Sequence, residues 1–501
     1  MGVTGARPLG SLLSEVSARV SAPATADRIV IRGISDDSRQ VQPGYLFVAV
    51  PGARQDGRAF IADAVGRGAV AIVAPSATTA EVPVIEADNV RGAMAELAAI
   101  WYGSPAERLR LIGITGSVGK TSVLSMLSAI LRHDGVAAGA IGSLGIEYGG
   151  HAESSVNTTA GPLVLQRALA GMVAAGVELA AMEVTSHALV QERVRGLRFD
   201  LGIFTNLVLL EHLDYHGSFA AYVGAKLRFF EHLRRAAPLV YSASDRVVDA
   251  LARSRQVRRV PCGGGTPAEA VHIRRLEQSV HGSRVVLEIL QPLPRIDGTG
   301  APPTRLELRL RMLGRPNTMN AALAATAALC LGARHTSVIE ALGSLEPPRR
   351  RMQVIHDAGP LVIDDTVGHP DSITAVFEVA AEFPHRALHV VFAVRGRRGP
   401  TINARDAEAL AIWSRTVPIA SLVITTGEDV ADQRNRVAPE EHDAFVSELQ
   451  REGVPFSYEP ALRDAVAVAV ERCDREDLLL LLGAQAMDAG AELALERLRR
   501  R

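Results

Sequence analysis

The sequence has few of the features that mark secreted, metal-clustered or nucleic-acid-binding proteins. Its 501 residues include three cysteines, Cys262, Cys330 and Cys473, which lie far apart in the chain. They predict neither a disulfide framework nor a metal cluster and are typical of a reducing cytosol. The formal net charge of −1 gives no basic footprint for nucleic acid. We therefore expect an ordinary globular protein without a nucleic-acid-binding surface.

Signals for membrane insertion are also missing. The most apolar short run, LLLLLG at 478–483, is too short to span a bilayer and predicts a buried parallel strand. The N-terminus, MGVTGARPLG, lacks the apolar core of a signal peptide, and Ala6 breaks the myristoylation pattern. These absences predict a cytoplasmic protein that does not enter a membrane.

The length of the chain and its alternating apolar runs predict three α/β domains. In the first, strands are expected at 46–50 and 69–74 and a helix at 92–102, before a linker rich in turn residues. No internal repeat or low-complexity tract interrupts the pattern. The predicted domains are 1–105, 106–346 and 347–501.

The second and third segments alternate strand-like and helical runs, which predicts mostly parallel sheets. In the second, strands at 179–183 and 201–205 alternate with helices at 163–175 and 219–235, and runs at 283–290 and 304–312 predict a hairpin with a floppy Pro- and Gly-rich tip. In the third, the runs LVIDD, HVVFAV, SLVITT and DLLLLL predict a doubly wound sheet.

The most specific motif is LIGITGSVGKTSVLSML, at 111–127, in which a short strand enters a glycine-rich turn and a helix. Backbone N–H groups and the helix dipole make such a turn an anion cradle. Lys120 is expected to reach the β/γ-phosphates and Thr121 to bind Mg²⁺. The strict pattern has glycine where Ile114 stands, so a Gly-rich surface loop is the alternative. The motif predicts ATP binding through Gly116, Gly119, Lys120, Thr121 and Ser122.

Two later residues are candidates for a metal site beside this loop. Glu183 ends an apolar strand, where open α/β sheets bind ligands, and a carboxylate there can hold the Mg²⁺ of a nucleotide. A solvent-exposed strand end is the alternative for Glu183. His212, in the run FTNLVLLEHLDYHG at 204–217, can ligate a metal or have a structural role.

Five motifs occur in order along the chain: GITGSVGKTS, NTT, MEVTSHALVQERV, TNL…EHLDYHG, and the Ala-Lys pair at 225–226. Together they resemble the central domain of the Mur ligases, most closely the type that adds the third residue of the peptidoglycan stem peptide. The run SDDSRQVQPGYLFVAVPGARQDGRAF, at 35–60, resembles the uridine-nucleotide-binding domain of that type. The resemblance implies a three-domain α/β architecture.

The resemblance also implies roles for individual residues. Lys120 matches the phosphate-loop lysine, Arg351 matches an arginine that reaches the γ-phosphate, and Lys226 matches a lysine that is carbamylated and binds the second magnesium. Metal ligands are then Thr121, Glu183, His212 and Lys226. ATP contacts extend to Asn320 near the adenine and to Asp365. Positions that match contacts with the nucleotide-sugar peptide are Ser38, Arg54, Gln55, Thr158, Thr159, Thr185, Gln191 and Arg193.

The third domain departs from the family's motifs. The histidine after its first strand is displaced by one residue in Asp365-Thr-Val-Gly-His369-Pro370, and Gly483-Ala-Gln-Ala-Met487 replaces a Lys-Gly-His-Glu run. The diaminopimelate-recognition motif Asp-Asn-Pro-Arg is absent, and TTGEDVADQ occupies its place. Its acids, Glu428, Asp429 and Asp432, favour a cationic incoming amine such as lysine or ornithine if they line the site. Solvent-facing acids, and an anion clamp made by Arg395, Arg397 and Arg398, are the alternatives.

We therefore expect an ATP-dependent amide ligase that adds an amino acid to a UDP-N-acetylmuramoyl-peptide through an acyl phosphate, in peptidoglycan precursor synthesis. ATP and Mg²⁺ are the expected cofactors, and the protein is expected to be a monomer. Two alternatives are a related ligase acting on another carboxylate, such as a polyglutamate chain, and a non-catalytic paralogue that binds a nucleotide-sugar. ATP hydrolysis that depends on both acceptor and amine separates them.

Overall fold

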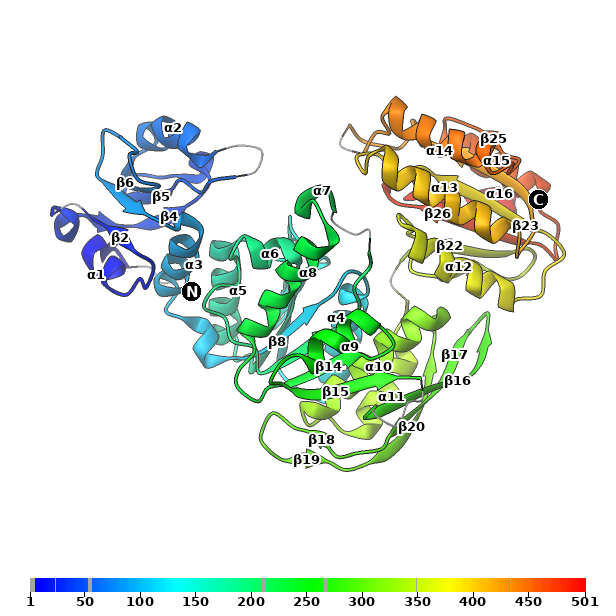
Figure 1. The fold of residues 1–501 in the computed structure, drawn as a ribbon, viewed down its shortest axis with the longest axis horizontal. Helices are drawn as coiled ribbons and strands as arrows, with labels where there is room; N and C mark the ends of the chain where they lie inside the picture. The colour runs from blue at the N-terminus through cyan, green and yellow to red at the C-terminus, as the bar shows by residue number, and fades with distance from the viewer. Residues whose placement is uncertain are drawn as a thin grey trace.

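The structure, a computed structural model, describes residues 5–22, 24–52, 56–209, 213–264, 269–347, 349–433 and 435–501. Within these residues the strands form three large sheets, one in each of the three predicted segments. Figure 1 shows the first and third sheets, with their helices, on either side of the central one. The predicted three-domain α/β class is confirmed, whereas the boundaries at 105/106 and 346/347 stay predictions.

The N-terminal sheet has five strands in the order β2-β7-β6-β5-β4, and only β2 runs antiparallel to its neighbour. Apolar residues of α1 and α3 pack on one face, and those of α2 pack on the other. The strands of the whole N-terminal domain, including the separate pair β1–β3, are β1 (Arg7–Pro8), β2 (Val20–Ser21), β3 (Val30–Ile31), β4 (Gly33–Ser35), β5 (Tyr45–Val48), β6 (Ala69–Ala74) and β7 (Val84–Ala87). The helices are α1 (Leu9–Ser14), α2 (Ile61–Gly66) and α3 (Val90–Trp101).

A polar junction fixes the N-terminal domain to the central one. Arg195 of the central domain donates to Glu96 of α3 at 2.8 Å and to Glu192 at 2.7 Å. Asn89, which caps α3, donates to Glu192 at 2.9 Å. Because Glu96 also accepts the backbone N–H groups of Ser17 and Ala18, the network ties three segments of the chain into one interface.

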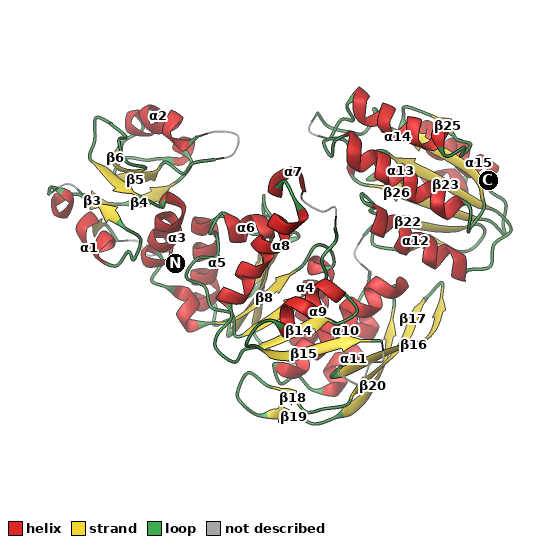
Figure 2. Ribbon diagram, viewed as in Figure 1, coloured by secondary structure: helices red, strands yellow, loops and turns green. Residues whose placement is uncertain are grey.

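The central sheet has eleven strands in the order β11-β10-β9-β12-β8-β13-β14-β15-β16-β17-β20. The strands from β9 through β12, β8, β13, β14 and β15 to β16 run parallel, and hairpin strands extend both edges. Residues of α4, α10 and α11 cover one face, and those of α5, α6, α8 and α9 cover the other. Figure 2 shows the helices as layers on the sheet. The carboxyl ends of the parallel strands lie together on one side of this sheet, and ligands bind at that side in open α/β folds.

The strands of this domain are β8 (Arg110–Thr115), β9 (Ala138–Gly142), β10 (Gly145–Tyr148), β11 (His151–Glu153), β12 (Leu179–Glu183), β13 (Leu201–Phe204), β14 (Pro238–Ser242), β15 (Arg258–Gly263), β16 (Val271–Ser279), β17 (Gly282–Ile289), β18 (Leu293–Pro294), β19 (Gly300–Ala301) and β20 (Thr304–Leu310). The helices are α4 (Lys120–His133), α5 (Pro162–Ala174), α6 (Ser186–Val190), α7 (Leu213–His216), α8 (Phe219–Leu227), α9 (Arg246–Arg253), α10 (Gly314–Cys330) and α11 (His335–Ser344).

Two expectations for this domain need correction. The helix expected over 219–235 ends at Leu227 and continues as a 3₁₀ turn over Arg228–His232, which buries Phe229 completely. The tip between β17 and β20 is not floppy, because β18 and β19 pair across it and Leu293 and Ala301 are buried. In both places tertiary packing decides the local structure.

The C-terminal sheet is doubly wound, as predicted. Its order is β21-β22-β26-β23-β24-β25, and all strands but β21 are parallel. Helices α12, α13 and α14 cover one face, and α15 and α16 cover the other. The strands are β21 (Gln353–His356), β22 (Leu361–Asp365), β23 (Leu388–Ala393), β24 (Ile419–Thr425), β25 (Ser457–Tyr458) and β26 (Leu478–Gly483). The helices are α12 (Pro370–Glu382), α13 (Pro400–Ser414), α14 (Pro439–Arg451), α15 (Leu462–Arg472) and α16 (Gly490–Arg499).

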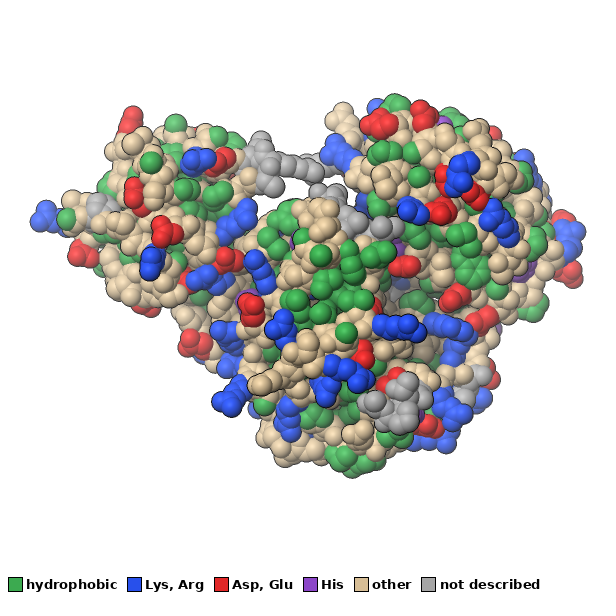
Figure 3. Space-filling model, in the orientation of Figure 1, with side chains coloured by type: hydrophobic (Ala, Val, Ile, Leu, Met, Phe, Trp, Pro, Cys, Tyr) green, Lys and Arg blue, Asp and Glu red, His purple; other side chains and the backbone are tan. Residues whose placement is uncertain are grey.

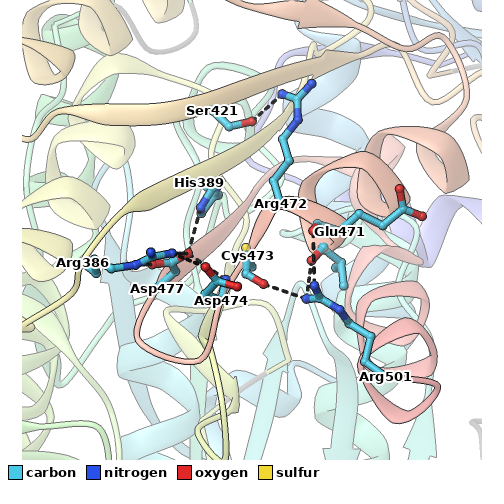
Figure 4. A network of polar contacts seen from close by, with 10 residues as sticks. Arg386, His389, Ser421, Glu471, Arg472, Cys473, Asp474, Asp477 and Arg501 are labelled. Carbon is cyan, nitrogen blue, oxygen red and sulfur yellow. Dashed lines mark hydrogen bonds and ion pairs between the residues drawn. The ribbon is translucent and has the colours of Figure 1, made fainter.

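The run 478–483 is strand β26 inside this sheet, buried along its whole length, so that prediction is also confirmed. Where β26 begins, a polar network joins neighbouring segments (Figure 4). Asp477 accepts from Arg386 at 3.1 Å and pairs with His389 at 3.2 Å. Burial opposes ionisation of Asp477, but these bonds lower its pKa to about 2.

Over the described ranges, no helix combines the length and apolar character that crossing a membrane requires.

Candidate active site

The glycine-rich turn follows β8 and opens directly into α4. Gly116 and Gly119 have φ angles of +139° and +88°, a region that favours glycine. At Gly119 an added Cβ would lie 2.5 Å from Oδ1 of Asn320, so α10 packs against the turn. Ile114, the residue that departs from the strict pattern, is fully buried within β8. The turn therefore begins after the strand, and the first N–H groups of α4 remain available to an anion.

Both lysines of the chain lie at this turn. The sequence contains only Lys120 and Lys226. Lys120 Nζ donates to the carbonyl oxygens of Gly116 at 2.9 Å and Ser117 at 2.7 Å. Lys226, on α8 and 1% exposed, donates to the same Gly116 carbonyl at 2.9 Å and to Thr115 Oγ1 at 3.0 Å. Two amines thus converge on one carbonyl oxygen.

A carboxylate and a hydroxyl lie beside the lysines. Glu183, at the end of β12, is fully buried, so the solvent-exposed alternative is wrong. Thr121 Oγ1 donates to its Oε1 at 3.0 Å, and the Ser143 N–H donates at 2.8 Å. Oxygen ligands of this kind suit Mg²⁺, and the pair fits a nucleotide-bound metal. His212, the other predicted ligand, lies outside the described residues.

The residues predicted to contact the nucleotide-sugar peptide form a connected shelf beside Glu183. Thr159 Oγ1 donates to the Glu183 carbonyl at 2.9 Å and accepts the Thr185 N–H at 3.0 Å. Arg193 donates to the Thr159 carbonyl at 2.7 Å and to Gln191 Oε1 at 2.7 Å. Thr158 accepts from Ser143 Oγ at 3.0 Å. The shelf joins β12 to the segment after α6.

The N-terminal domain approaches this shelf through one carboxylate. Burial raises the pKa of Asp36, and the nearby Arg193 charge opposes the rise. Ser38 is buried on a 3₁₀ turn, Ser38–Gln40, and is not among the residues that line the two cavities described below. Arg54 and Gln55 lie outside the described residues. Of the three predicted contacts in this domain, the structure therefore places only Ser38, which lines neither cavity.

Two cavities meet at the phosphate loop, between the central and C-terminal domains. The large cleft has a volume of about 730 Å³ and the smaller cavity about 490 Å³. From the described part of the chain, the residues that line both are Val118, Gly119, Ser122, Arg351, Thr366 and His369. The space-filling view shows the outer domains standing on either side of the central one (Figure 3). Arg351 is thus on the wall shared by the two cavities.

The smaller cavity brings together the other predicted ATP contacts. Asn320 and Asn317 of α10 line it, as does Asp365 at the end of β22. Asp365 is 8% exposed and accepts the Met352 N–H at 2.7 Å. Burial raises the pKa of Asp365 to about 6. The smaller cavity therefore brings residues of α10 and of the C-terminal domain beside the phosphate loop.

The far wall of the large cleft is basic. Arg395, Arg397 and Arg398 line it, and Glu441 holds this loop by accepting the N–H groups of Arg397, Arg398 and Gly399 at 2.6–3.0 Å. Sequence reasoning missed Glu441, because an acid in the first turn of a helix ordinarily predicts a local cap. Its capping role is present too, since it accepts the Ala438 N–H.

The acids expected to face the incoming amine have other roles. Asp429 accepts the N–H of Leu462 at the start of α15, Asp432 accepts from Asn435, and Glu428 is exposed. Of the described residues that line the large cleft, none is Glu428, Asp429 or Asp432. The prediction of an acidic lining is therefore wrong.

These features define a class of protein. The carboxyl ends of two parallel sheets meet around a phosphate loop, as in an α/β protein that binds a nucleoside triphosphate between domains. Family models match in chain order: the Mur ligase family catalytic domain over residues 30–112, the Mur ligase middle domain over 114–328, and the Mur ligase glutamate ligase domain over 350–485. The chain belongs to the Mur ligase family.

Similar proteins extend over nearly the whole chain. A UDP-N-acetylmuramoyl-L-alanyl-D-glutamate–2,6-diaminopimelate ligase of Geobacillus thermodenitrificans is 33% identical, covering 89% of this chain and 88% of that protein. One from Ectopseudomonas mendocina is also 33% identical, covering 92% and 91%. A solved structure of a ligase with this description matches with a TM-score of 0.66 at 22% identity, covering 97% of this chain and 94% of that one. At this sequence identity, the match to the solved structure shows a similarity of fold.

The close contact at Gly119 generates a prediction. Gly119→Ala combines an unfavourable φ with a clash against Asn320, whereas Gly135→Ala has a similar φ, +82°, and open space around the added methyl group. We expect Gly119→Ala to weaken ATP binding at least about tenfold, or 1.4 kcal/mol. Titration calorimetry of both variants measures this, with Gly135→Ala as the strain-matched control. Equal affinities in the two variants would contradict it.

Proposed function

We propose that this protein is an ATP-dependent ligase that joins an amino acid to the peptide carboxylate of a UDP-N-acetylmuramoyl-peptide, forming ADP and phosphate. One observation carries the proposal: Lys120, the Glu183–Thr121 pair and Arg351 all line the large cleft. The similarity to diaminopimelate ligases over nine-tenths of the chain supports this substrate class. Peptidoglycan precursor synthesis in the cytoplasm, by a monomer, is part of the proposal.

The reaction proceeds in two steps. The acceptor carboxylate attacks the γ-phosphorus of ATP, which forms an acyl phosphate and releases ADP. The amine then attacks the acyl carbon, phosphate leaves, and the amine gives up a proton. Charge neutralisation and alignment dominate such transfers. In this assignment the smaller cavity holds the nucleoside near Asn320 and Asp365, and Lys120 and Arg351 neutralise the phosphates.

The acceptor enters from the side of the N-terminal domain. In this assignment the shelf of Thr158, Thr159, Thr185, Gln191 and Arg193 holds the sugar-peptide, and Ser38, Arg54 and Gln55 hold the uridine nucleotide. The polar junction at Arg195 keeps the two domains in fixed register. The large cleft is then the space in which carboxylate, γ-phosphate and amine meet, since both Arg193 of the shelf and Arg395 of the C-terminal domain line it.

Magnesium would be held by Thr121, Glu183, His212 and Lys226, and it would neutralise phosphate charge. Lys226 fits this role once it carries a carbamate. As ammonium groups, Lys120 and Lys226 lie no more than 5.8 Å apart because each is 2.9 Å from the same oxygen. At an effective dielectric constant near 20 their repulsion is about 3 kcal/mol. Carbamylation would replace the repulsion by attraction.

The basic wall of the large cleft favours an incoming amino acid with a second carboxylate. Arg395, Arg397 and Arg398 line it, and paired guanidinium–carboxylate hydrogen bonds are strong and directional. The same charges disfavour lysine or ornithine. We therefore propose diaminopimelate, or an amino acid of similar charge, as the incoming amine, in place of the cationic amine that the sequence favoured.

The first test concerns Lys120. Replacement by alanine removes a fixed cation aimed at the β/γ-phosphates. Loss of such a transition-state contact costs on the order of 3 kcal/mol, roughly a hundredfold in rate. Phosphate release is measured with ATP, UDP-N-acetylmuramoyl-dipeptide and amino acid together and with each omitted. We expect release to require all three and to fall at least a hundredfold in Lys120→Ala. Release near the wild-type rate in the variant would refute the assignment.

The second test concerns the amine. Diaminopimelate, lysine and ornithine are offered together at equal concentration, and product masses are compared. The basic wall predicts a clear excess of the diaminopimelate product, and Arg395→Ala should reduce this preference. Preference for lysine or ornithine would show that the arginines do not select the substrate.

The third test concerns the carbamate on Lys226. Because the chain has only two lysines, replacing each in turn assigns a ¹³C carbamate signal seen after equilibration with labelled bicarbonate. We expect a carbamate signal that persists in Lys120→Ala and disappears in Lys226→Ala. Lys226→Ala should be nearly inactive and regain part of its activity with added acetate, which supplies the missing carboxylate. A variant that is fully active without acetate argues against the carbamate.

A further inference from the structure

The backbone between the central and C-terminal domains is strained around Arg351. Arg350 and Met352 have φ angles of +57° and +50°, so both flanking residues are left-handed. Residues other than glycine adopt this conformation rarely, and it persists where the surroundings impose it. Arg351 itself is exposed and lines both cavities. The direction of the Arg351 side chain therefore depends on a turn in which Arg350 and Met352 both adopt a conformation that their residue types do not favour.

The side chain of Arg350 explains why the turn persists. It is 8% exposed, and its guanidinium donates to Asp364 Oδ1 at 3.2 Å, to the Ala484 carbonyl at 2.9 Å, to the Gly483 carbonyl and to Asp488. Four contacts occupy most of the donors of a guanidinium group. The Arg350 N–H donates to Gln353 at 3.1 Å. Arg350 is thus held from within the C-terminal domain.

The partners of Arg350 lie next to both cavities. Asp364 precedes Asp365, which lines the smaller cavity and accepts the Met352 N–H. Gly483 ends β26, and Ala484 and Gln485 line the large cleft. One buried guanidinium therefore joins the junction turn to the carboxyl ends of two neighbouring strands, β22 and β26.

We propose that Arg350 is a positioning residue: it holds the left-handed turn that aims Arg351 at the shared wall. This inference rests on the proposed function, in which Arg351 neutralises the γ-phosphate. Arg350 itself lines neither cavity among the described residues and acts through its neighbour.

The variants separate positioning from backbone strain. Arg350→Gly removes the guanidinium and relieves the unfavourable φ, whereas Arg350→Ala removes the guanidinium and keeps the strain. Arg349→Ala is the matched control, since Arg349 is exposed and pairs with exposed Glu492. We expect kcat to fall about tenfold or more in both Arg350 variants and to stay within twofold in Arg349→Ala. A kcat within twofold of wild type in Arg350→Gly would overturn the proposal.

A double-mutant cycle tests whether Arg350 acts through Arg351. In an Arg351→Ala background, Arg350→Gly should cause little further loss of kcat, because the group being aimed is absent. Losses that multiply would mean an independent, structural role and would overturn the proposal. Melting temperatures are recorded for all variants, and activity is normalised to folded protein.

Hydrogen exchange provides a readout that does not depend on catalysis. The Met352 N–H, which donates to Asp365, should exchange faster in Arg350→Gly than in Arg349→Ala. Unchanged exchange would overturn the positioning role. If the wild type shows no amine-dependent phosphate release, the proposed function fails, and exchange at Met352 still decides whether Arg350 holds the turn.

Discussion

The structure depends on one carbonyl oxygen, that of Gly116, which accepts from both lysines of the chain. Lys120 reaches it from the start of α4 and Lys226 from α8, so helices on opposite faces of the sheet meet under the phosphate loop. Two cations at one oxygen repel each other unless anions lie beside them. In the proposed function, phosphate beside Lys120 and the carbamate on Lys226 would relieve this repulsion. The same electrostatic constraint therefore organises the loop, the metal ligands and the proposed carbamate.

Around this point the fold brings together the carboxyl ends of two parallel sheets. The central sheet supplies the phosphate loop and Glu183, and the C-terminal sheet supplies Asp365, Arg395 and Ala484. Because each sheet is rigid, the geometry of the site depends on the chain that joins them. The left-handed turn at Arg350 and Met352 lies in that joining segment, which is why a residue outside both cavities can control chemistry within them.

The sequence predicted those parts of the site that depend on local chemistry. The phosphate loop, Glu183 and the threonine shelf each follow a strand, and parallel strands place their carboxyl ends together. The acids at 428–432 were placed in the amine site because they occupy the position of the family's recognition motif. The sequence does not reveal that Asp429 caps a distant helix. Glu441 and Arg350 could not be found either. The loop N–H groups that Glu441 accepts lie 42–44 residues away, and three of the groups that the Arg350 guanidinium contacts lie 133–138 residues away.

The composition of the chain supports the assignment of the two lysines. Of 54 Lys and Arg residues, 52 are arginine, so arginine supplies nearly all the positive charge, including the basic wall and the buried contact at Arg350. A guanidinium group stays protonated and is a poor nucleophile toward CO₂, whereas an amine that loses its proton can form a carbamate. A general preference for arginine accounts for the 52 arginines but not for lysine at 120 and 226. At 226 the buried amine donates to Thr115 and Gly116, and the ability of an amine to form a carbamate is the property that arginine cannot supply.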